Sequence, residues 1–229
     1  MSEQQHKPTS PSQDWGCQTD DLYLIHGIFR RIFSLSEALV QDADPADPHR
    51  VQLVEGHLRE LLEVLHNHHE HEDILWWDRL KQRAPESAPD VDRMIAAHKA
   101  VAVDIADAQA LLTAWRQQPK EKAALIARLG QLKELLFAHL ADEEKSILPV
   151  AGRVLSQKEW DEAHSIGMNE IPKDRLLVQV GYMLKCAPTP ELRQLFLDGI
   201  PGFVKVLYRL IGKRKFEREW ESLYGSLPV

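Results

Sequence analysis

Residues 66 to 73, HNHHEHED, place four histidines, two glutamates and an aspartate in eight positions. Imidazole nitrogens and carboxylate oxygens are common protein ligands of transition metals. Residues four apart on a helix project from the same face, so a histidine and a carboxylate at that spacing can hold one ion. The segment therefore predicts a metal site. Three pairs have the spacing: His66 with Glu70, His68 with Glu72, and His69 with Asp73.

Helical phase distinguishes the three pairs. His68 and Glu72 follow Leu61 and Leu65 at intervals of three and four residues, which predicts that they point inward with the leucines. His66 and Glu70 share the phase of a polar face, and His69 and Asp73 lie at the flank of the apolar stripe. We expect these last four side chains to be solvated or to lie behind the ligands.

The inward pattern occurs twice in the chain. His139 and Glu143 continue a second apolar stripe by the same steps, and His26 and His98 each lie among apolar residues of an earlier helical segment. His26 precedes His68 by 42 residues, and His98 precedes His139 by 41. The sequence therefore predicts two copies of one helical hairpin, each contributing a histidine and then a His-x-x-x-Glu pair. Burial of two carboxylates is costly unless cations compensate them, which favours a metal site.

The segments that position these residues have helical periodicity. Apolar residues recur at helical spacing over residues 20–41, 49–83, 91–112 and 125–147, with proline-containing polar breaks between them. Short turns between helices give antiparallel neighbours, so an all-α, up-down-up-down four-helix bundle is predicted. The inward histidines of the second hairpin lie at nearly equal distances from its turn, so all six ligands are expected at one level of the bundle.

The bundle is predicted to occupy residues 19–152. Residues 1–18 are rich in Ser, Gln, Pro and Thr, which predicts a flexible tail. After Pro149 the pattern changes: SQKE at 156–159 is a capping box, and shorter helical segments follow. We expect residues 153–229 to form a C-terminal helical extension packed on the bundle.

Composition narrows the functional classes. The chain has 229 residues, 44% of them apolar, and no apolar run or basic leader that predicts a membrane span or export, so a cytoplasmic location is expected. A net charge of −7 argues against nucleic acid as a partner. Cys17 and Cys186 lie far apart with no C-x-x-C motif, so reduced, unreactive thiols are expected. The basic patch KRKFER could touch anionic partners or be a solvated helix face.

The ligand set indicates the metal. Four imidazoles and two carboxylates exceed what one tetrahedral zinc requires, and thiolates typical of structural zinc are missing from the set. If each of two ions takes two histidines and the glutamates bridge them, room remains for an oxo or hydroxo bridge and an open position. Nitrogen and oxygen ligands with open positions suit redox-active iron.

These residues resemble the hemerythrin-like, or HHE cation-binding, family, whose motif order is H…HxxxE…H…HxxxE. The matching segments are HHEHEDILWWD, AAHKAV and HLADEEKSILP, together with His26. The resemblance covers roughly residues 20–150, and IPKDRLL and YRLIGKRKF in the extension are similar to bacterial hemerythrin-like proteins. It implies a non-haem centre of two iron ions in a four-helix bundle. The Glu-x-x-His pattern of ferritin-like proteins is not found in the inward stripes.

Two features refine the resemblance. Oxygen-carrying hemerythrins use five histidines, whereas only four are in phase here, so their asymmetric iron pair is not expected. Tyr23, one helical turn before His26, matches a tyrosine of similar bacterial sequences and could be an extra ligand, a hydrogen-bond donor to a bound oxidant, or a tyrosine at the bundle rim.

The sequence leaves the reaction open. The preferred hypothesis is a diiron protein that binds and reacts with hydrogen peroxide, nitric oxide or dioxygen in oxidative or nitrosative stress defence, with no catalytic side chain assigned beyond the metal centre. The alternative is a non-catalytic sensor or carrier of oxygen, nitric oxide or redox state that signals through its C-terminal helices. The small oxidant is the expected partner, with neither membrane nor nucleic acid, and no protein partner is indicated.

Overall fold

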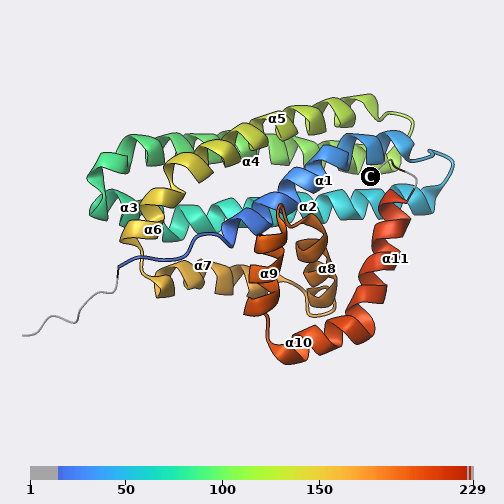
Figure 1. The fold of residues 1–229 in the computed structure, drawn as a ribbon. Coiled ribbons are helices and arrows are strands. Elements are labelled where there is room, and N and C mark those ends of the chain that lie inside the picture. The colour runs from blue at the N-terminus through green and yellow to red at the C-terminus, as the bar shows by residue number, and fades with distance from the viewer. Residues whose placement is uncertain (1–14, 226, 228–229) are drawn as a thin grey trace, which may run out of the picture.

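The computed structural model describes residues 15–225 and 227 (Figure 1). Within these residues the chain is helical, and its only β-type contact is an isolated bridge between Gly16 and Ser156. The prediction of an all-α fold is confirmed. No helix in the described part of the chain is both long enough and apolar enough to cross a membrane.

Four long helices form the bundle: α1 (Leu22–Asp42), α2 (Pro48–Leu75), α4 (Ala88–Gln117) and α5 (Ala123–Ser146). α1 packs against α2 and α5, and α4 packs against the same two helices, as an up-down-up-down bundle requires (Figure 1). Their inward stripes bury a continuous core of aliphatic and aromatic side chains. The start of α2 is fixed locally, because the Asp47 side chain accepts a hydrogen bond from the Arg50 N–H and Pro48 is the first helical residue.

Two helices are interrupted near the predicted ligands. The helix predicted over 49–83 is two helices, α2 and α3 (Trp77–Arg83), and α5 is followed by α6 (Leu148–Val154) after a break at Ile147. Pro149 accounts for the second break, because it lacks the N–H that would continue the ladder. At the first break Trp76 and Trp77 are each only 2% exposed. The first break therefore lies where two consecutive indole rings are buried.

The N-terminal segment that is described is held in place. The Gly16 N–H donates to the Leu155 carbonyl at 2.9 Å, and the Cys17 N–H donates to the Gly152 carbonyl at 3.1 Å. Gly16 has φ +109°, a conformation that favours glycine. The flexible tail predicted for residues 1–18 therefore extends too far at its C-terminal end, and residues 1–14 lie outside the described residues.

The extension consists of short helices beside the bundle (Figure 1). The predicted capping box is confirmed, because Ser156 and Glu159 exchange hydrogen bonds at the start of the first of these helices. The elements are α7 (Gln157–Glu170), α8 (Leu176–Cys186), α9 (Pro190–Gly199), α10 (Gly202–Leu207), the π-helical η2 (Tyr208–Gly212) and α11 (Lys213–Tyr224). α7 lies along α2, whereas α8 contacts both α1 and α11.

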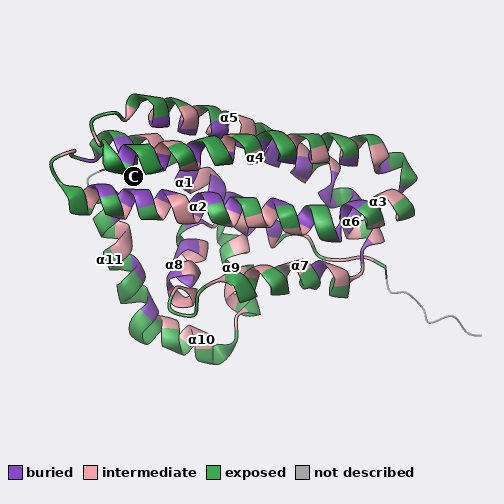
Figure 2. Cartoon of the chain, turned by 180° about the vertical axis from the view of Figure 1, so that it is seen from behind, coloured by how far each residue is buried: buried purple, intermediate pink, exposed green. Residues whose placement is uncertain are grey.

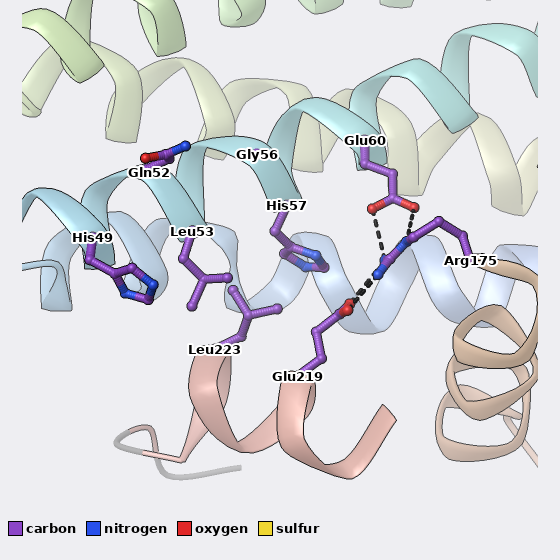
Figure 3. Close-up of a pocket in the computed structure, with 9 residues that line it drawn as sticks. All are labelled: His49, Gln52, Leu53, Gly56, His57, Glu60, Arg175, Glu219 and Leu223. Carbon is purple, nitrogen blue, oxygen red and sulfur yellow. Dashed lines mark hydrogen bonds and ion pairs between the residues drawn. The ribbon is translucent and has the colours of Figure 1, made fainter. Parts of the chain in front are cut away.

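An arginine joins the extension to the bundle. Arg175, just before α8, pairs with Glu60 of α2 through bonds of 3.0 and 2.9 Å and also binds Glu219 of α11 (Figure 3). A cavity of about 370 Å³ opens beside these pairs and is also lined by His57, whose ring bonds the Tyr224 hydroxyl. Burial lowers the pKa of His57 to about 4, so its ring is neutral. This histidine is part of the packing between the bundle and the extension.

Both cysteines are free thiols. Burial, followed by nearby carboxylates, raises the pKa of Cys17 to about 11, and burial raises that of Cys186 to about 12. A thiol with a raised pKa is a poor nucleophile. The two cysteines therefore do not have the properties of a reactive pair.

Candidate metal centre

Seven side chains converge between the four bundle helices. Six of the seven residues are almost fully buried, and the seventh, His68, has a side chain that is 12% exposed. They come from all four helices: His26 from α1, His68, His69 and Glu72 from α2, His98 from α4, and His139 and Glu143 from α5. The structure thus brings together the six residues that the sequence singles out and adds His69.

The donor atoms fall into two groups, each able to surround one cation. One contains three imidazoles, those of His69, His98 and His139. The other contains two imidazoles and two carboxylates: His26, His68, Glu72 and Glu143. Within each group the candidate ligand atoms lie within 4.8 Å of one another.

The two carboxylates connect the groups. Glu72 has one oxygen 3.2 Å from His68 Nε2 and the other 3.6 Å from His98 Nε2, so it faces one histidine of each group. Glu143 Oε2 is likewise 3.5 Å from His26 Nε2 and 3.8 Å from His139 Nε2. Two ligands of one first-row ion, each about 2.1 Å from it, lie about 3.0 to 3.4 Å apart. The 3.2 Å separation falls in this range and the other three are slightly longer, and each carboxylate lies between the two groups of donors.

These donors fit a bound cation for a second reason. Ten buried nitrogen and oxygen atoms of the seven residues have no hydrogen-bond partner, and only two other such atoms occur in the described side chains, Trp76 Nε1 and Arg79 Nη1. A buried polar atom without a partner is costly, so most proteins pair nearly all of them. A cation bound between these side chains would compensate such a cluster of unpaired atoms.

The acid–base state of the cluster agrees with cation binding. Burial lowers the pKa values of His26, His68 and His69, and burial together with neighbouring histidines lowers that of His139 to about 3. These imidazoles are therefore neutral and have a free lone pair. Burial, with a smaller effect of Glu144, raises the pKa of Glu143 to about 8. Without positive charge nearby, this carboxyl group would stay protonated at neutral pH.

Two further carboxylates orient the histidines. Nδ1 of His26 donates to Glu144 at 2.8 Å, and Nδ1 of His98 donates to Asp73 at 2.7 Å, so Nε2 of each ring is free to face the centre. Burial opposes ionisation of Glu144, but hydrogen bonds from His26 and Arg30 outweigh it and lower the pKa. Such carboxylate–histidine pairs fix the ring and raise its basicity toward a metal.

Helical phase predicts only one of these supporting residues. Asp73, from the HxxxD pair at the flank of the stripe, lies behind a ligand as expected. Glu144 and Arg30 were missed, because Glu144 follows a ligand directly in the sequence and Arg30 looks like an ordinary surface cation. An Arg one turn after His26 and a second acid after Glu143 were the available signals.

The placement of His69 corrects a prediction. A solvated or supporting position was expected, but His69 is 4% exposed and its ring stacks on His98 within the three-histidine group. His68 and His69 are adjacent in the sequence, but α2 contacts both α1 and α4. The two rings therefore belong to different groups of donors. Five histidines rather than four therefore point inward, and the two groups of candidate donors contain three and two of them. His66 and Glu70 are exposed, as predicted.

Tyr23 lies partly buried near the start of α1 and packs against the smaller hydrophobic cluster at that end of the bundle. Burial, with contributions from Glu144 and Asp20, raises the pKa of its phenol. The phenol is therefore protonated at neutral pH, and the negative charge of Glu144 contributes to its raised pKa.

The comparisons with known proteins agree with this geometry. Residues 17–151 match the family described as hemerythrin HHE cation binding domain, which covers more than half of the chain. Comparison with curated proteins and with solved structures gave no significant match. The matched segment contains all seven converging side chains and ends where the extension begins. The chain belongs to the hemerythrin HHE cation-binding family.

Proposed function

We propose that the chain is a non-haem diiron protein that binds and reacts with small oxidants, namely hydrogen peroxide, nitric oxide or dioxygen, in oxidative or nitrosative stress defence. The observation that carries the proposal is the set of ten unpaired buried donor atoms in two adjacent groups. His69, His98 and His139 would hold one ion, His26 and His68 the other, and Glu72 and Glu143 would bridge them.

The unequal groups support reaction with an exogenous ligand. Two irons, when bound, supply redox chemistry in one-electron steps at neighbouring sites. If Glu72 and Glu143 served both ions, the ion held by His26 and His68 would have one protein ligand fewer than the ion held by the three histidines. An open position for a small molecule is therefore expected on the side of His26 and His68.

A small crevice lies near this side of the centre. A narrow crevice of about 40 Å³, lined mainly by apolar side chains, lies beside Phe29 and is also lined by Ile25, Leu61 and Val64. The Phe29 ring is 5.3 Å from the ring of His68. A space of this size holds only one or two water-sized molecules. Peroxide and diatomic molecules are small enough to enter this crevice, which none of the seven converging side chains lines.

Tyr23 is best explained as a hydrogen-bond donor at the rim of the centre. Its raised pKa disfavours the phenolate that would serve as a ligand. A Tyr23→Phe protein should therefore keep its full metal content and change only the rate or affinity of oxidant binding. Loss of an ion from this variant would favour coordination instead.

Metal content per chain tests the proposal first. The protein from iron-supplemented cells should contain about two irons per chain by elemental mass spectrometry, and His68→Ala should lose metal whereas the exposed His66→Ala should not. Purified diiron protein should then consume hydrogen peroxide or nitric oxide under excess substrate. One zinc per chain, or no metal, would remove the basis of the redox function.

A second candidate function is a sensor, favoured by one contact. Gly27 follows the proposed ligand His26, and a Cβ built on Gly27 would lie 2.8 Å from the Cys186 carbonyl and from the ring of Pro188. The turn between α8 and α9 therefore packs against α1 directly beside the proposed ligand His26. Any shift of α1 that accompanies a change in the centre would be transmitted to the extension.

Turnover separates the two functions. An enzyme should consume oxidant over many cycles, with no requirement for a change in the extension. A sensor should bind reversibly without turnover, and the protease sensitivity of residues 153–229 should differ between the reduced and oxidised protein.

A further inference from the structure

The outermost helix of the extension exposes an apolar stripe. Five large apolar residues of α10 and η2 recur at spacings of one, three and four, so they share one helix face. We call them the α10 stripe: Phe203 (68% exposed), Val206 (52%), Leu207 (42%), Leu210 (71%) and Ile211 (49%). A contiguous exposed apolar face of this kind marks an interaction site in soluble proteins.

The rest of the same helix is packed. In α11 the apolar face is turned toward the body of the extension, where Phe216 and Trp220 contact Tyr182 of α8. Gly212 directly follows the stripe and is buried. A Cβ added to it would lie 2.8 Å from the Cβ of Leu177, so the helix backbone packs closely against α8 at this point. The stripe is therefore on a helix that is firmly anchored at one end, and its exposure does not result from lack of support.

Charge distinguishes the possible partners. Residues 199–216 contain five cations, Lys205, Arg209, Lys213, Arg214 and Lys215, and no acidic residue, in a chain whose net charge is −7. All except Lys205 are exposed, and Lys213 forms one exposed ion pair with Glu217. Cations thus flank and follow the stripe along one helix. This segment combines an apolar face with a local positive charge.

We propose that α10 and η2 bind the surface of an anionic lipid bilayer, with the stripe inserted among the acyl chains and the cations among the headgroups. An amphipathic helix with Phe and Leu on one face and Lys and Arg beside it lies in the membrane interface in this way. A second copy of the chain is a poorer occupant, because a two-fold contact through the stripe would bring its two sets of five cations together. Nucleic acid would leave the stripe without a partner.

The position of the segment suits such contact. α10 lies at the edge of the molecule farthest from α4 and α5 (Figure 1), and its residues are mostly exposed in the view from behind (Figure 2). The bundle can therefore remain in water while the helix lies on a surface. This interfacial contact differs from a membrane span, for which no described helix qualifies. It also does not depend on the identity or redox state of the metal.

Vesicle binding by the full-length metal-loaded protein tests the proposal. The protein should sediment with vesicles of 70% phosphatidylcholine and 30% phosphatidylglycerol, and pure phosphatidylcholine vesicles should bind it about tenfold more weakly. Raising salt from 0.05 to 0.5 M should release it, because screening weakens the headgroup contacts. Phe203→Glu with Leu210→Glu should abolish binding, and Lys213→Glu with Lys215→Glu should weaken it about tenfold or more.

Matched controls make the result specific. Ile74 and Val103 are 70% and 62% exposed on bundle helices, so Ile74→Glu with Val103→Glu removes equally exposed apolar residues outside the stripe and should leave binding unchanged. Helical circular dichroism and the metal content of each variant verify folding. In a Phe203→Trp protein, brominated phosphatidylglycerol should quench the added fluorescence.

Three outcomes would overturn the proposal. The folded protein could fail to bind anionic vesicles at millimolar lipid, or bind them equally well after the stripe is changed. Sedimentation equilibrium could instead show a dimer that Phe203→Glu with Leu210→Glu dissociates while vesicles bind nothing, which would assign the stripe to a second copy.

Discussion

The rings of His69 and His98 stack with their centroids 4.2 Å apart and their planes at 15°. They come from two different helices, and His139 from a third meets His98 edge-on at 4.7 Å. Three imidazoles in such contact do not satisfy one another with hydrogen bonds, and the Nε2 atoms of all three lack partners. The third histidine on this side makes the two groups of candidate donors unequal.

Replacement of His69 by alanine should therefore remove metal. The expected result is a loss of the ion on the three-histidine side, so iron content falls from about two toward one or fewer per chain by elemental analysis. His66→Ala is the matched control three residues earlier, because His66 is exposed and should keep both ions. Equal metal content in the two variants would contradict the role proposed for His69.

Much of this centre could be predicted from helical phase, and the failure at His69 has a physical reason. The stripe through Leu65, His68 and Glu72 describes only the face of α2 that points at the bundle axis. A bundle helix contacts two neighbours, α1 and α4, so its buried arc is wide enough for adjacent residues. Sequence periodicity detects the middle of that arc and assigns its edge to solvent.

The supporting carboxylates should control metal affinity without holding the metal. Asp73→Asn and Glu144→Gln keep shape but remove the charge behind His98 and His26, and a loss of about 10- to 100-fold in iron affinity is expected from competition with a chelator. Asp142→Asn is the control, since Asp142 lies beside Glu143 but binds Arg93 on the surface. An unchanged affinity in both variants would show that these carboxylates do not tune the centre.

The pH dependence of the metal-free protein should reveal the buried carboxyl groups. The pKa of Glu143 is about 8 in the folded chain against 4.5 as its ordinary value, so between pH 6.5 and 8 the folded state binds more protons than the unfolded state. An unfolded histidine is about half protonated at pH 6.5, so the buried histidines with lowered pKa values oppose this effect, and comparison with Glu143→Gln isolates the carboxyl group. The stability of the metal-free wild type relative to metal-free Glu143→Gln should therefore fall by about 1 to 2 kcal/mol as pH rises from 6.5 to 8.

Urea unfolding in the presence of a chelator measures this effect. Metal-free Glu143→Gln should show a flatter profile because one of the raised carboxyl groups is gone, whereas the iron-loaded wild type should not lose stability in this range. Parallel pH profiles of the metal-free wild type and metal-free Glu143→Gln would contradict burial of the Glu143 carboxyl group in the neutral form.

Two glycines in bundle helices should respond oppositely to alanine. Gly27 leaves no space, because an added Cβ would lie 2.8 Å from backbone and proline atoms of the α8–α9 turn, so Gly27→Ala should destabilise the protein by about 1 to 3 kcal/mol. At Gly56 in α2 nothing lies within 4 Å, and Gly56→Ala should stabilise by about 0.5 to 1 kcal/mol through helix propensity. Denaturant unfolding compares them, and two effects of the same sign would contradict the close packing at Gly27.

The attachment of the extension was less predictable than the bundle. Its capping box and proline breaks mark where helices begin and end, but the partners of each helix depend on pairs such as Arg175 with Glu60, which are 115 residues apart. Local periodicity contains no information on a contact of that separation. The stripe on α10 has the same origin, because a sequence pattern shows an apolar face but not whether another helix covers it.

Arg175 should hold the extension on the bundle. Its guanidinium binds both Glu60 and Glu219, and its side chain is only 23% exposed, so Arg175→Gln leaves two carboxylates facing each other and should cost about 2 kcal/mol. Arg93→Gln is the control, because Arg93 also binds two carboxylates but is 48% exposed, and a loss of less than about 0.5 kcal/mol is expected. Limited proteolysis should cut residues 153–229 faster in Arg175→Gln, while metal content stays at the wild-type level because none of the seven converging side chains contacts Arg175. Equal proteolysis of the two variants would show that the extension is held mainly by the apolar contacts of α8 with α1.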